Sequence, residues 1–450
     1  MGKVERQMAM ASHLRSMSRG VKVLTRALAG LVSATCLIVT APADPIPPGW
    51  TASRLEVVGF TGLEGRPGAF KLAIKHAANG HWYLYAGHSF DLGWSIIDVT
   101  EPANPRYVKF IPYETQAKVL TAQLTLHDNL MITAIDQVSK TDPALLIWDI
   151  SDPENPKRIG EWKGGEGGSH RNSYPGGRYA YLSTYMPGYH GRGHELVILD
   201  VADPAKPKVS GVWAQPGQKD GETLPAIGPG FHGPASISPD GKMASMGFTP
   251  DVVNLDISDP ANPKLIGRLP IVPPFLYAGN QSVHTVLPFW DRKILFVSSE
   301  ARHAGCDQDP MSLAGLVDNK DPAKPRLISM FPTPRPPKGA PYKSFCDKGG
   351  RFGPHNTVME LHNPDVHRQT NTMYVTWFNA GLRAFDIADP YMPTEVGWFI
   401  PPERHDAKEQ SGNHASPINW TEDVTQDARG YIYADDDKWG IWILRDPNQK

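Results

Sequence analysis

The sequence predicts an all-β fold, a seven-bladed β-propeller that the N-terminal strand closes by completing the last blade. The prediction rests on three observations. A short corner phrase recurs along the 450-residue chain at intervals of about 50 to 70 residues. Each interval holds four short β-rich runs, and the first β-rich run of the chain resembles the fourth run of the other intervals. Four antiparallel strands per repeat of this length are typical of a propeller blade.

The corner phrase is an acidic strand end followed by a proline-rich turn, first seen as DVTEPANP at residues 98–105. Further copies occupy residues 149–156, 200–207, 256–263, 318–325 and 386–393, and a truncated copy occupies residues 441–447. Proline has no backbone N–H and a fixed φ, so it ends a strand and turns the chain. A β-sandwich would not repeat one corner seven times, whereas a propeller uses it once per blade.

The strands of one blade can be read from the sixth interval. Its four β-rich runs are residues 355–361, 372–378, 382–387 and 394–400. The seventh interval stops after its third run, and residues 54–60 match the fourth-run pattern of residues 264–269. We therefore expect residues 54–60 to complete the last blade, which removes an exposed sheet edge.

Residues 1–43 predict a secretory signal peptide, and residues 44–450 are expected to form the propeller. A basic lead is followed by an apolar run at residues 27–39 and by the small-residue site Ala41-Pro42-Ala43. This is the order of charge, apolar segment and small residues that signals use, and the run is short for a membrane span. The mature protein is thus expected to be periplasmic or secreted, without a membrane span.

Export leaves two cysteines, Cys306 and Cys346, and an oxidising compartment favours a disulfide between them, the alternative being two unrelated thiols. The charge is balanced, with 45 basic against 47 acidic residues. No basic excess exists to neutralise phosphates, so no nucleic-acid partner is expected. We expect a monomer that acts on a small molecule.

The apolar runs that precede two of the corners resemble the signature of the LVIVD-repeat proteins. These runs are LVILDV at residues 196–201 and LIWDI at residues 146–150, each followed by the Asp-Pro corner. The resemblance implies a propeller fold and an exported protein. It implies no particular chemistry, since a fold does not supply a function.

Four histidines stand at equivalent positions, at the start of the expected innermost strand of four successive blades. They are His170, His232, His284 and His355. Innermost strands converge on the propeller axis, so these imidazoles are expected to hold one divalent transition metal. Iron or copper is favoured, and manganese and zinc are alternatives. The same position in the last blade holds Glu422 and Asp423, as a further ligand or as an outer partner of one.

The alternative interpretation is that these histidines are structural, and that they hydrogen-bond one blade to the next. The metal interpretation is similar in arrangement, though not in sequence, to the four-histidine iron centre of the carotenoid cleavage oxygenases. It is similar in the same sense to the copper-dependent methanethiol oxidase and selenium-binding group.

Loops on the same face carry three residues that could orient a substrate or transfer a proton: Tyr185, Arg192 and Glu300. Residues 435–437 are three aspartates, interpreted as a solvated acidic loop with a calcium-type cluster as the alternative. The long connections at 270–281, 331–354 and 400–419 could roof the channel mouth. They would contribute Phe275, Tyr277, Phe352 and His414.

Two classes of function follow. The first is an exported metal-dependent enzyme that acts on a small organic substrate at the channel mouth. Oxidation or oxygenation is the favoured reaction class, and metal-assisted hydrolysis or elimination is the second choice. The second is a non-catalytic propeller that binds a protein, a glycan or a periplasmic ligand.

Overall fold

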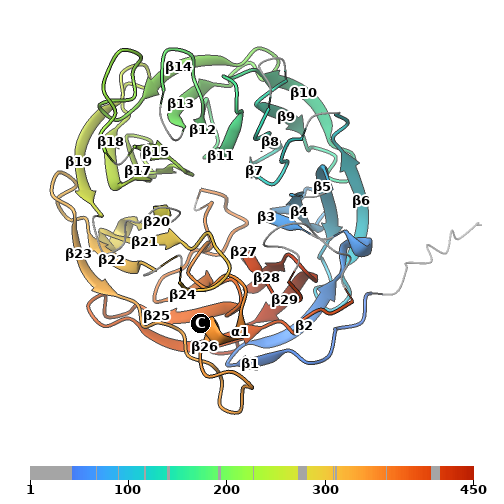
Figure 1. Ribbon diagram of the computed structural model, residues 1–450. Coiled ribbons are helices and arrows are strands. Elements are labelled where there is room, and N and C mark those ends of the chain that lie inside the picture. Colours follow the sequence, from blue (N-terminus) through green and yellow to red (C-terminus); the bar gives the residue numbers. More distant parts are fainter. Residues whose placement is uncertain are drawn as a thin grey trace, which may run out of the picture. The chain divides into compact units, whose positions relative to one another are not determined.

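The computed structural model describes residues 43–449 except 67, 90, 116–117, 139–141, 191–193, 227, 272–280, 308, 310–311, 361 and 407–415. Seven antiparallel sheets follow one another around a ring (Figure 1), which confirms the predicted propeller. Apart from Ala43, the predicted signal segment lies outside the described residues, and export stays a prediction. Among the described residues, no helix has the length and hydrophobicity that a membrane span requires.

The strands, given blade by blade from the axis outward, are as follows. Blade one has β3 (Ala69–His76), β4 (Trp82–His88), β5 (Gly93–Asp98) and β6 (Arg106–Pro112); blade two has β7 (Leu124–His127), β8 (Leu130–Ala134), β9 (Leu145–Asp149) and β10 (Lys157–Trp162). Blade three has β11 (Ser169–Ser173), β12 (Tyr179–Thr184), β13 (Glu195–Asp200) and β14 (Lys208–Trp213); blade four has β15 (Gly230–Phe231) and β16 (Ser236–Ile237), then β17 (Met243–Thr249), β18 (Asp251–Asp256) and β19 (Lys264–Pro270). Blade five has β20 (Gln281–Phe289), β21 (Ile294–Glu300), β22 (Ala314–Asp318) and β23 (Arg326–Met330). Blade six has β24 (Thr372–Thr376), β25 (Leu382–Asp386), β26 (Thr394–Ile400) and β1 (Thr51–Ser53); blade seven has β27 (Thr421–Gln426), β28 (Tyr431–Asp436), β29 (Gly440–Arg445) and β2 (Glu56–Thr61). The helical turns are η1 (Leu63–Gly65), η2 (Trp290–Arg292) and α1 (Phe345–Lys348).

The repeated corner has one hydrogen-bond pattern in all seven blades. The aspartate that ends the third strand accepts a hydrogen bond from the backbone N–H two residues later, for example Ser151 N to Asp149 Oδ1 at 2.8 Å. The other six aspartates are Asp98, Asp200, Asp256, Asp318, Asp386 and Asp446. This side-chain turn starts the proline corner, and it explains why the phrase recurs.

Neighbouring blades meet where a corner fits against a glycine. A Cβ atom at Gly160 in β10 would collide with the carbonyl of Pro204 in the corner of blade three. Gly59 in β2 meets the carbonyl of Pro102 in blade one in the same way. Any larger residue would push the corners away, so these glycines set the blade spacing.

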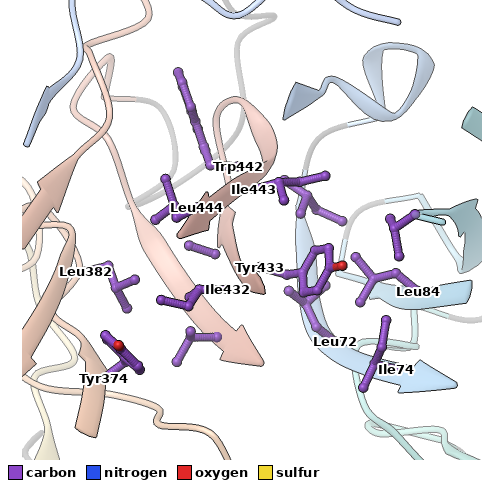
Figure 2. Close-up of a cluster of buried hydrophobic side chains, with 14 of the residues drawn as sticks. Leu72, Ile74, Leu84, Tyr374, Leu382, Ile432, Tyr433, Trp442, Ile443 and Leu444 are labelled. Carbon is purple, nitrogen blue, oxygen red and sulfur yellow. The ribbon is translucent and has the colours of Figure 1, made fainter. Parts of the chain in front are cut away.

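The ring closes as the sequence predicts. β2 pairs antiparallel with β29, with Val57 opposite Leu444 and Phe60 opposite Trp442. Figure 2 shows the apolar cluster at the closure, where Tyr433, Trp442 and Leu444 of blade seven lie between side chains of blades six and one. Burial of this cluster joins the first and last parts of the described chain.

One predicted strand does not form. Residues 355–360 run along β24 in the place of an innermost strand, but apart from an isolated bridge at Thr357 they do not form a ladder. Backbone hydrogen bonds join only the start of this segment to β24, from His355 N to Thr376 O and from Thr376 N to Asn356 O, both at 2.9 Å. Further along, side chains replace them: Gln369 Oε1 accepts from Tyr374 N at 2.7 Å and Thr357 Oγ1 donates to Tyr374 O at 2.6 Å. Glu360 then takes a φ of 56°, which a strand does not allow.

Candidate metal centre

The four predicted histidines lie side by side in a row that crosses blades three to six, with His284 and His355 buried and His170 and His232 partly exposed. His170 lies in β11 and His284 in β20, His232 directly follows β15, and His355 begins the inner segment of blade six. The ring centroids of successive histidines are 4.4, 4.1 and 4.5 Å apart. The equivalence of the four sequence positions therefore translates into contact.

The Nδ1 atoms of three of these rings are held by acceptors behind them. His170 Nδ1 lies 2.7 Å from Asp136 Oδ2, and His355 Nδ1 lies 2.8 Å from the backbone carbonyl of Glu422. A carboxylate or carbonyl only accepts, so each Nδ1 carries the proton and donates it. In the neutral ring, the lone pair is then on Nε2.

The third ring follows the same logic through a hydroxyl. His284 Nδ1 lies 2.8 Å from Thr285 Oγ1, and Thr285 Oγ1 donates its own proton to the carbonyl of His355 at 3.1 Å. The hydroxyl must therefore accept from His284 Nδ1. The Nε2 lone pair of His284 is left in the buried interior, where this atom has no hydrogen-bond partner.

The Nε2 atoms and one carboxylate converge. His170 Nε2 and His232 Nε2 are 3.1 Å apart, and Glu300 Oε2 lies 3.6 Å from His284 Nε2 and 3.9 Å from His232 Nε2. Glu300 Oε1 lies 4.0 Å from His355 Nε2. Two ligand atoms bound to one ion at about 2.1 Å stand roughly 3.0 to 3.5 Å apart. Small side-chain shifts would thus bring the ligand atoms of His232, His284 and Glu300, which all lie within 4.8 Å of one another, onto a common ion.

Burial favours the neutral form of His232, His284 and His355. It lowers the pKa of His355 to about 3 and holds the pKa values of His232 and His284 well below the usual range. The neighbouring cations add to this effect on His284, with Arg171 first among them. Neutral imidazoles are the form that binds a metal ion, so no proton has to leave these rings first.

Glu300 remains ionised although it is buried. Burial raises its pKa, but the charge of Arg351, with smaller contributions from His355 and Arg302, lowers it below the usual range. Arg351 donates to Glu300 Oε1, and its Nε donates to the carbonyl of Ala301 at 2.5 Å. The guanidinium lies over the rings of Phe378 and Trp420, at 4.2 and 4.8 Å from their centroids. The carboxylate is therefore fixed in place.

A disulfide links the segment that carries Glu300 to the segment that carries Arg351. Cys306, in the connection after β21, is bonded to Cys346 in α1, with Cα atoms 5.6 Å apart. This confirms the predicted pairing. The long connection before blade six thus supplies a supporting cation to the site.

The carboxylate of Glu422 does not lie among the Nε2 atoms of the histidine row. It is 3.5 Å from His355 Nδ1, on the side of the ring away from Nε2, and Trp420 Nε1 donates to it. Burial, opposed by Arg351, raises its pKa to about 8. Of the two roles predicted for Glu422, this geometry fits the outer partner that orients His355 and not the direct ligand. Its backbone carbonyl accepts from His355 Nδ1 at 2.8 Å, and its carboxylate lies 3.5 Å from the same nitrogen.

The residues predicted for catalysis lie in three different situations. Glu300 lies among the Nε2 atoms, with Oε2 3.6 Å from His284 Nε2 and 3.9 Å from His232 Nε2. Tyr185 packs on His194 at 4.3 Å between ring centroids, and His194 stacks on His170 at 6.0 Å, so Tyr185 is one ring away from the row. Arg192 lies outside the described residues.

The predicted roof is only partly within the described chain. Phe275, Tyr277 and His414 lie outside it. Phe352 packs on Phe345 at 5.6 Å, within the apolar cluster between blades five and six.

The three aspartates at residues 435–437 are buried, so the prediction of a solvated acidic loop there is wrong. Their side chains belong to the end of β28 and the turn after it, with exposures of 0, 0 and 3%. Asp436 accepts from Trp420 N at 2.9 Å, and burial raises its pKa to about 6. Burial and the neighbouring carboxylates raise the pKa of Asp435 well above its usual value.

Sequence reasoning missed Asp136, Arg171 and Arg351. Asp136 follows β8 in a loop that joins second and third strands, the same loop class that pointed to Glu300, so this rule could have found it. Arg351 lies in an irregular connection where no periodic signal exists. Arg171 directly follows His170 and was hidden by its more conspicuous neighbour.

Comparison with known proteins supports the fold and leaves the chemistry open. The family described as LVIVD repeat matches residues 189–214 and 248–270. No curated protein matches the chain. Among solved structures, the periplasmic gluconolactonase PpgL of Pseudomonas aeruginosa is 12% identical with a TM-score of 0.51, over 80% of this chain and 94% of that one.

Two further solved structures are equally distant. The Cps50 (Swd1) β-propeller domain of Myceliophteria thermophila is 12% identical over 84% of this chain and 97% of that chain, with a TM-score of 0.50. A Lactobacillus plantarum protein is 11% identical over 78% of this chain and 90% of that chain, also with a TM-score of 0.50. Likenesses at this identity establish a shared fold and nothing finer.

Proposed function

The chain is an LVIVD-repeat β-propeller, and we propose that it is an exported metal-dependent enzyme acting on a small organic substrate. One divalent transition metal would be held by His232, His284 and Glu300, with His170 and His355 as further ligands. The substrate would bind where the row of imidazoles meets the channel.

The observation that carries the proposal is the convergence of three imidazole lone pairs with one carboxylate. Three imidazoles have their Nδ1 protons fixed behind them, so their Nε2 lone pairs are directed toward one buried region together with the carboxylate of Glu300. Buried lone pairs that face one another are unfavourable unless a cation lies between them. The structural role considered for these histidines, hydrogen bonding between blades, fits the contact between His170 and His232, but it would leave His284 Nε2 with a partner, and this atom has none.

The donor set suggests which ions fit. The ligand atoms of His232, His284 and Glu300 lie within 4.8 Å of one another. Two histidines and one carboxylate form the facial set of non-haem iron oxygenases, and imidazole also suits copper and zinc. Iron and copper are our first choices, with manganese and zinc as alternatives.

Oxidation or oxygenation of the substrate is the reaction class we favour, and metal-assisted hydrolysis or elimination comes second. A bound transition metal would supply redox chemistry or polarise a bound group. The chain's own residues would hold the ion and shape its surroundings. Arg351 keeps Glu300 ionised and in place, and the buried aromatic walls exclude bulk water.

We further propose a periplasmic or secreted monomer with a small-molecule substrate and no nucleic-acid partner. A disulfide between Cys306 and Cys346 and a periplasmic protein among the fold's neighbours support an extracytoplasmic location. The balanced charge supports the absence of a nucleic-acid partner.

Elemental analysis tests the metal. Protein purified without chelators should contain about one transition-metal ion per chain, and His284→Ala should lose it. His81→Ala is the matched control, because that ring is half exposed and pairs with Asp98 at the outer part of blade one. Oxygen uptake by iron- or copper-loaded protein with a panel of small organic substrates, compared with zinc-loaded protein, tests the reaction class.

Two results would contradict the proposal. Metal-free protein of full stability that cannot be loaded would favour the binding module for a protein, glycan or periplasmic ligand. Metal retained by His284→Ala would place the ion elsewhere.

A further inference from the structure

A buried arginine lies directly beside the histidine row. Arg171 follows His170 in β11 and is only 3% exposed. Its Cβ lies 3.2 Å from the position that a Cβ on Gly233 would occupy, and Gly233 follows His232. The arginine is therefore flanked by the backbone of two predicted ligands, on two successive blades.

Arg171 belongs to the innermost strand of its blade, β11, and its side chain is buried there. Burial lowers the pKa of Arg171, and the charges of Glu300, Asp423 and Glu422 oppose this shift.

No group in the described part of the chain neutralises this cation directly. Nε and one Nη of Arg171 are buried without a hydrogen-bond partner, and no carboxylate in that part of the chain lies within ion-pair distance. The two carboxylates whose charges act most strongly on Arg171 are bound to other groups. Glu300 binds Arg351, and Asp423 Oδ2 accepts from Leu72 N at 2.9 Å and from Lys71 Nζ at 3.3 Å.

A buried guanidinium without partners is costly, since removal of a charge from water is repaid only by a counter-charge and hydrogen bonds. The folded protein retains this unfavourable burial of charge beside the proposed metal site. A ligand that brings one negative charge and two acceptor oxygens would satisfy both free N–H positions at once.

We propose that Arg171 is the recognition residue for a small organic monoanion, and that it binds the carboxylate of the substrate while the reacting end lies at the histidine row. The part of this inference that concerns the reacting end rests on the proposed function. A monocarboxylate fits better than a phosphate dianion, because Glu300 and Asp423 would repel a second negative charge. The substrate class is thus narrowed from small organic molecules to short organic acids.

The test uses the full-length protein, metal-free and zinc-loaded, in buffer without chloride. Thermal unfolding and calorimetry follow the binding of acetate and propionate, with acetamide as the uncharged analogue and chloride as a simple anion. Arg171→Gln removes the charge and Arg171→Met keeps the volume. Arg178→Gln is the control, since Arg178 belongs to the same blade, is 62% exposed and pairs with Asp200 at 2.7 Å.

We expect acetate and propionate to stabilise the wild type and Arg178→Gln, and acetamide to have no effect. In Arg171→Gln the carboxylate affinity should fall by about tenfold or more, because a charge-assisted fork is lost. Unliganded Arg171→Met should unfold at a temperature no lower than the wild type, because a buried charge is removed. If Arg171→Gln does not fold, Arg171→Met carries the comparison.

The inference is overturned if the wild type binds no carboxylate, if Arg171→Gln binds it as the wild type does, or if chloride or acetamide stabilises equally well. The metal content of the same samples separates the two proposals. If carboxylate binding depends on Arg171 but the protein takes up no metal, the proposed function is contradicted and the anion site is supported. If the protein retains metal but carboxylate binding does not depend on Arg171, the anion site is contradicted and the metal site is supported.

Discussion

Asp136 is the hydrogen-bond partner of His170, and its substitution tests the proposed metal centre with the least disturbance of the structure. Its Oδ2 accepts the Nδ1 proton of His170 at 2.7 Å, and it makes no ligand contact itself. Asp136→Asn keeps the size and an acceptor oxygen but removes the charge that makes the imidazole more basic. Loss of such an outer carboxylate lowers metal affinity by about 10- to 100-fold, which corresponds to about 1.4 to 2.8 kcal/mol.

Competition of the protein with a chromophoric chelator for zinc measures this loss directly. The matched control is Asp128→Asn, since Asp128 also pairs with a histidine, His127 Nδ1 at 3.1 Å, but is 82% exposed. We expect weaker binding only in Asp136→Asn, with the unfolding midpoint of the metal-free protein nearly unchanged. An affinity equal to the wild type, in a protein whose His284→Ala variant binds no metal, would refute the role given to the carboxylate.

Three further predictions concern neighbouring parts of the site. Glu300→Gln should weaken zinc binding more than Glu422→Gln in the same chelator assay, because only the Glu300 carboxylate faces the Nε2 atoms; equal losses would contradict this assignment. Replacement of Cys306 and Cys346 by serine should lower the free energy of unfolding by about 4 kcal/mol, from the chain entropy of the loop that the bond closes across 40 positions; urea titration measures it, and an unchanged midpoint would show that the bond adds no stability. The pKa of His355 lies at about 3 in the folded state and at about 6.5 when unfolded, so the unfolded chain takes up more protons between these values and the metal-free protein should lose stability as pH falls through that window. His355→Gln should flatten this part of the stability profile, and an identical slope in urea titrations would refute the cause.

Much of the fold could be predicted because its determinant is local. Each blade repeats an aspartate that caps its own corner, as Asp149 does for Ser151, and this side-chain turn is visible in sequence as a periodic phrase. Closure could be predicted because β2 carries the same pattern as other outer strands. The inner strand of blade six could not, because contacts from Gln369 and Thr357 replace its ladder, and these depend on tertiary placement.

The site divides in the same way. The contact among the four histidines followed from equivalent positions in successive blades, which symmetry brings to the axis. The roles of Glu300 and Glu422 did not follow, because each depends on which side of a ring the carboxylate reaches. Arg351 enters from an irregular connection that a disulfide holds, and no repeat position identifies it.

Charge is unevenly distributed around the axis, and this distribution bears on the proposed anion site. Blades three to six contribute the histidine row, the cation of Arg171 and the carboxylate of Glu300, which Arg351 balances, whereas blade seven contributes the buried carboxyl groups of Asp423, Asp435 and Asp436. Lys71 of blade one offsets part of that acidity, through Asp423. Under the proposal for Arg171, an organic anion would bind with its carboxylate at Arg171 and away from blade seven. A neutral substrate would have no such preference and a cationic substrate would have the opposite one, which is why the charge of the ligand is the property to establish first.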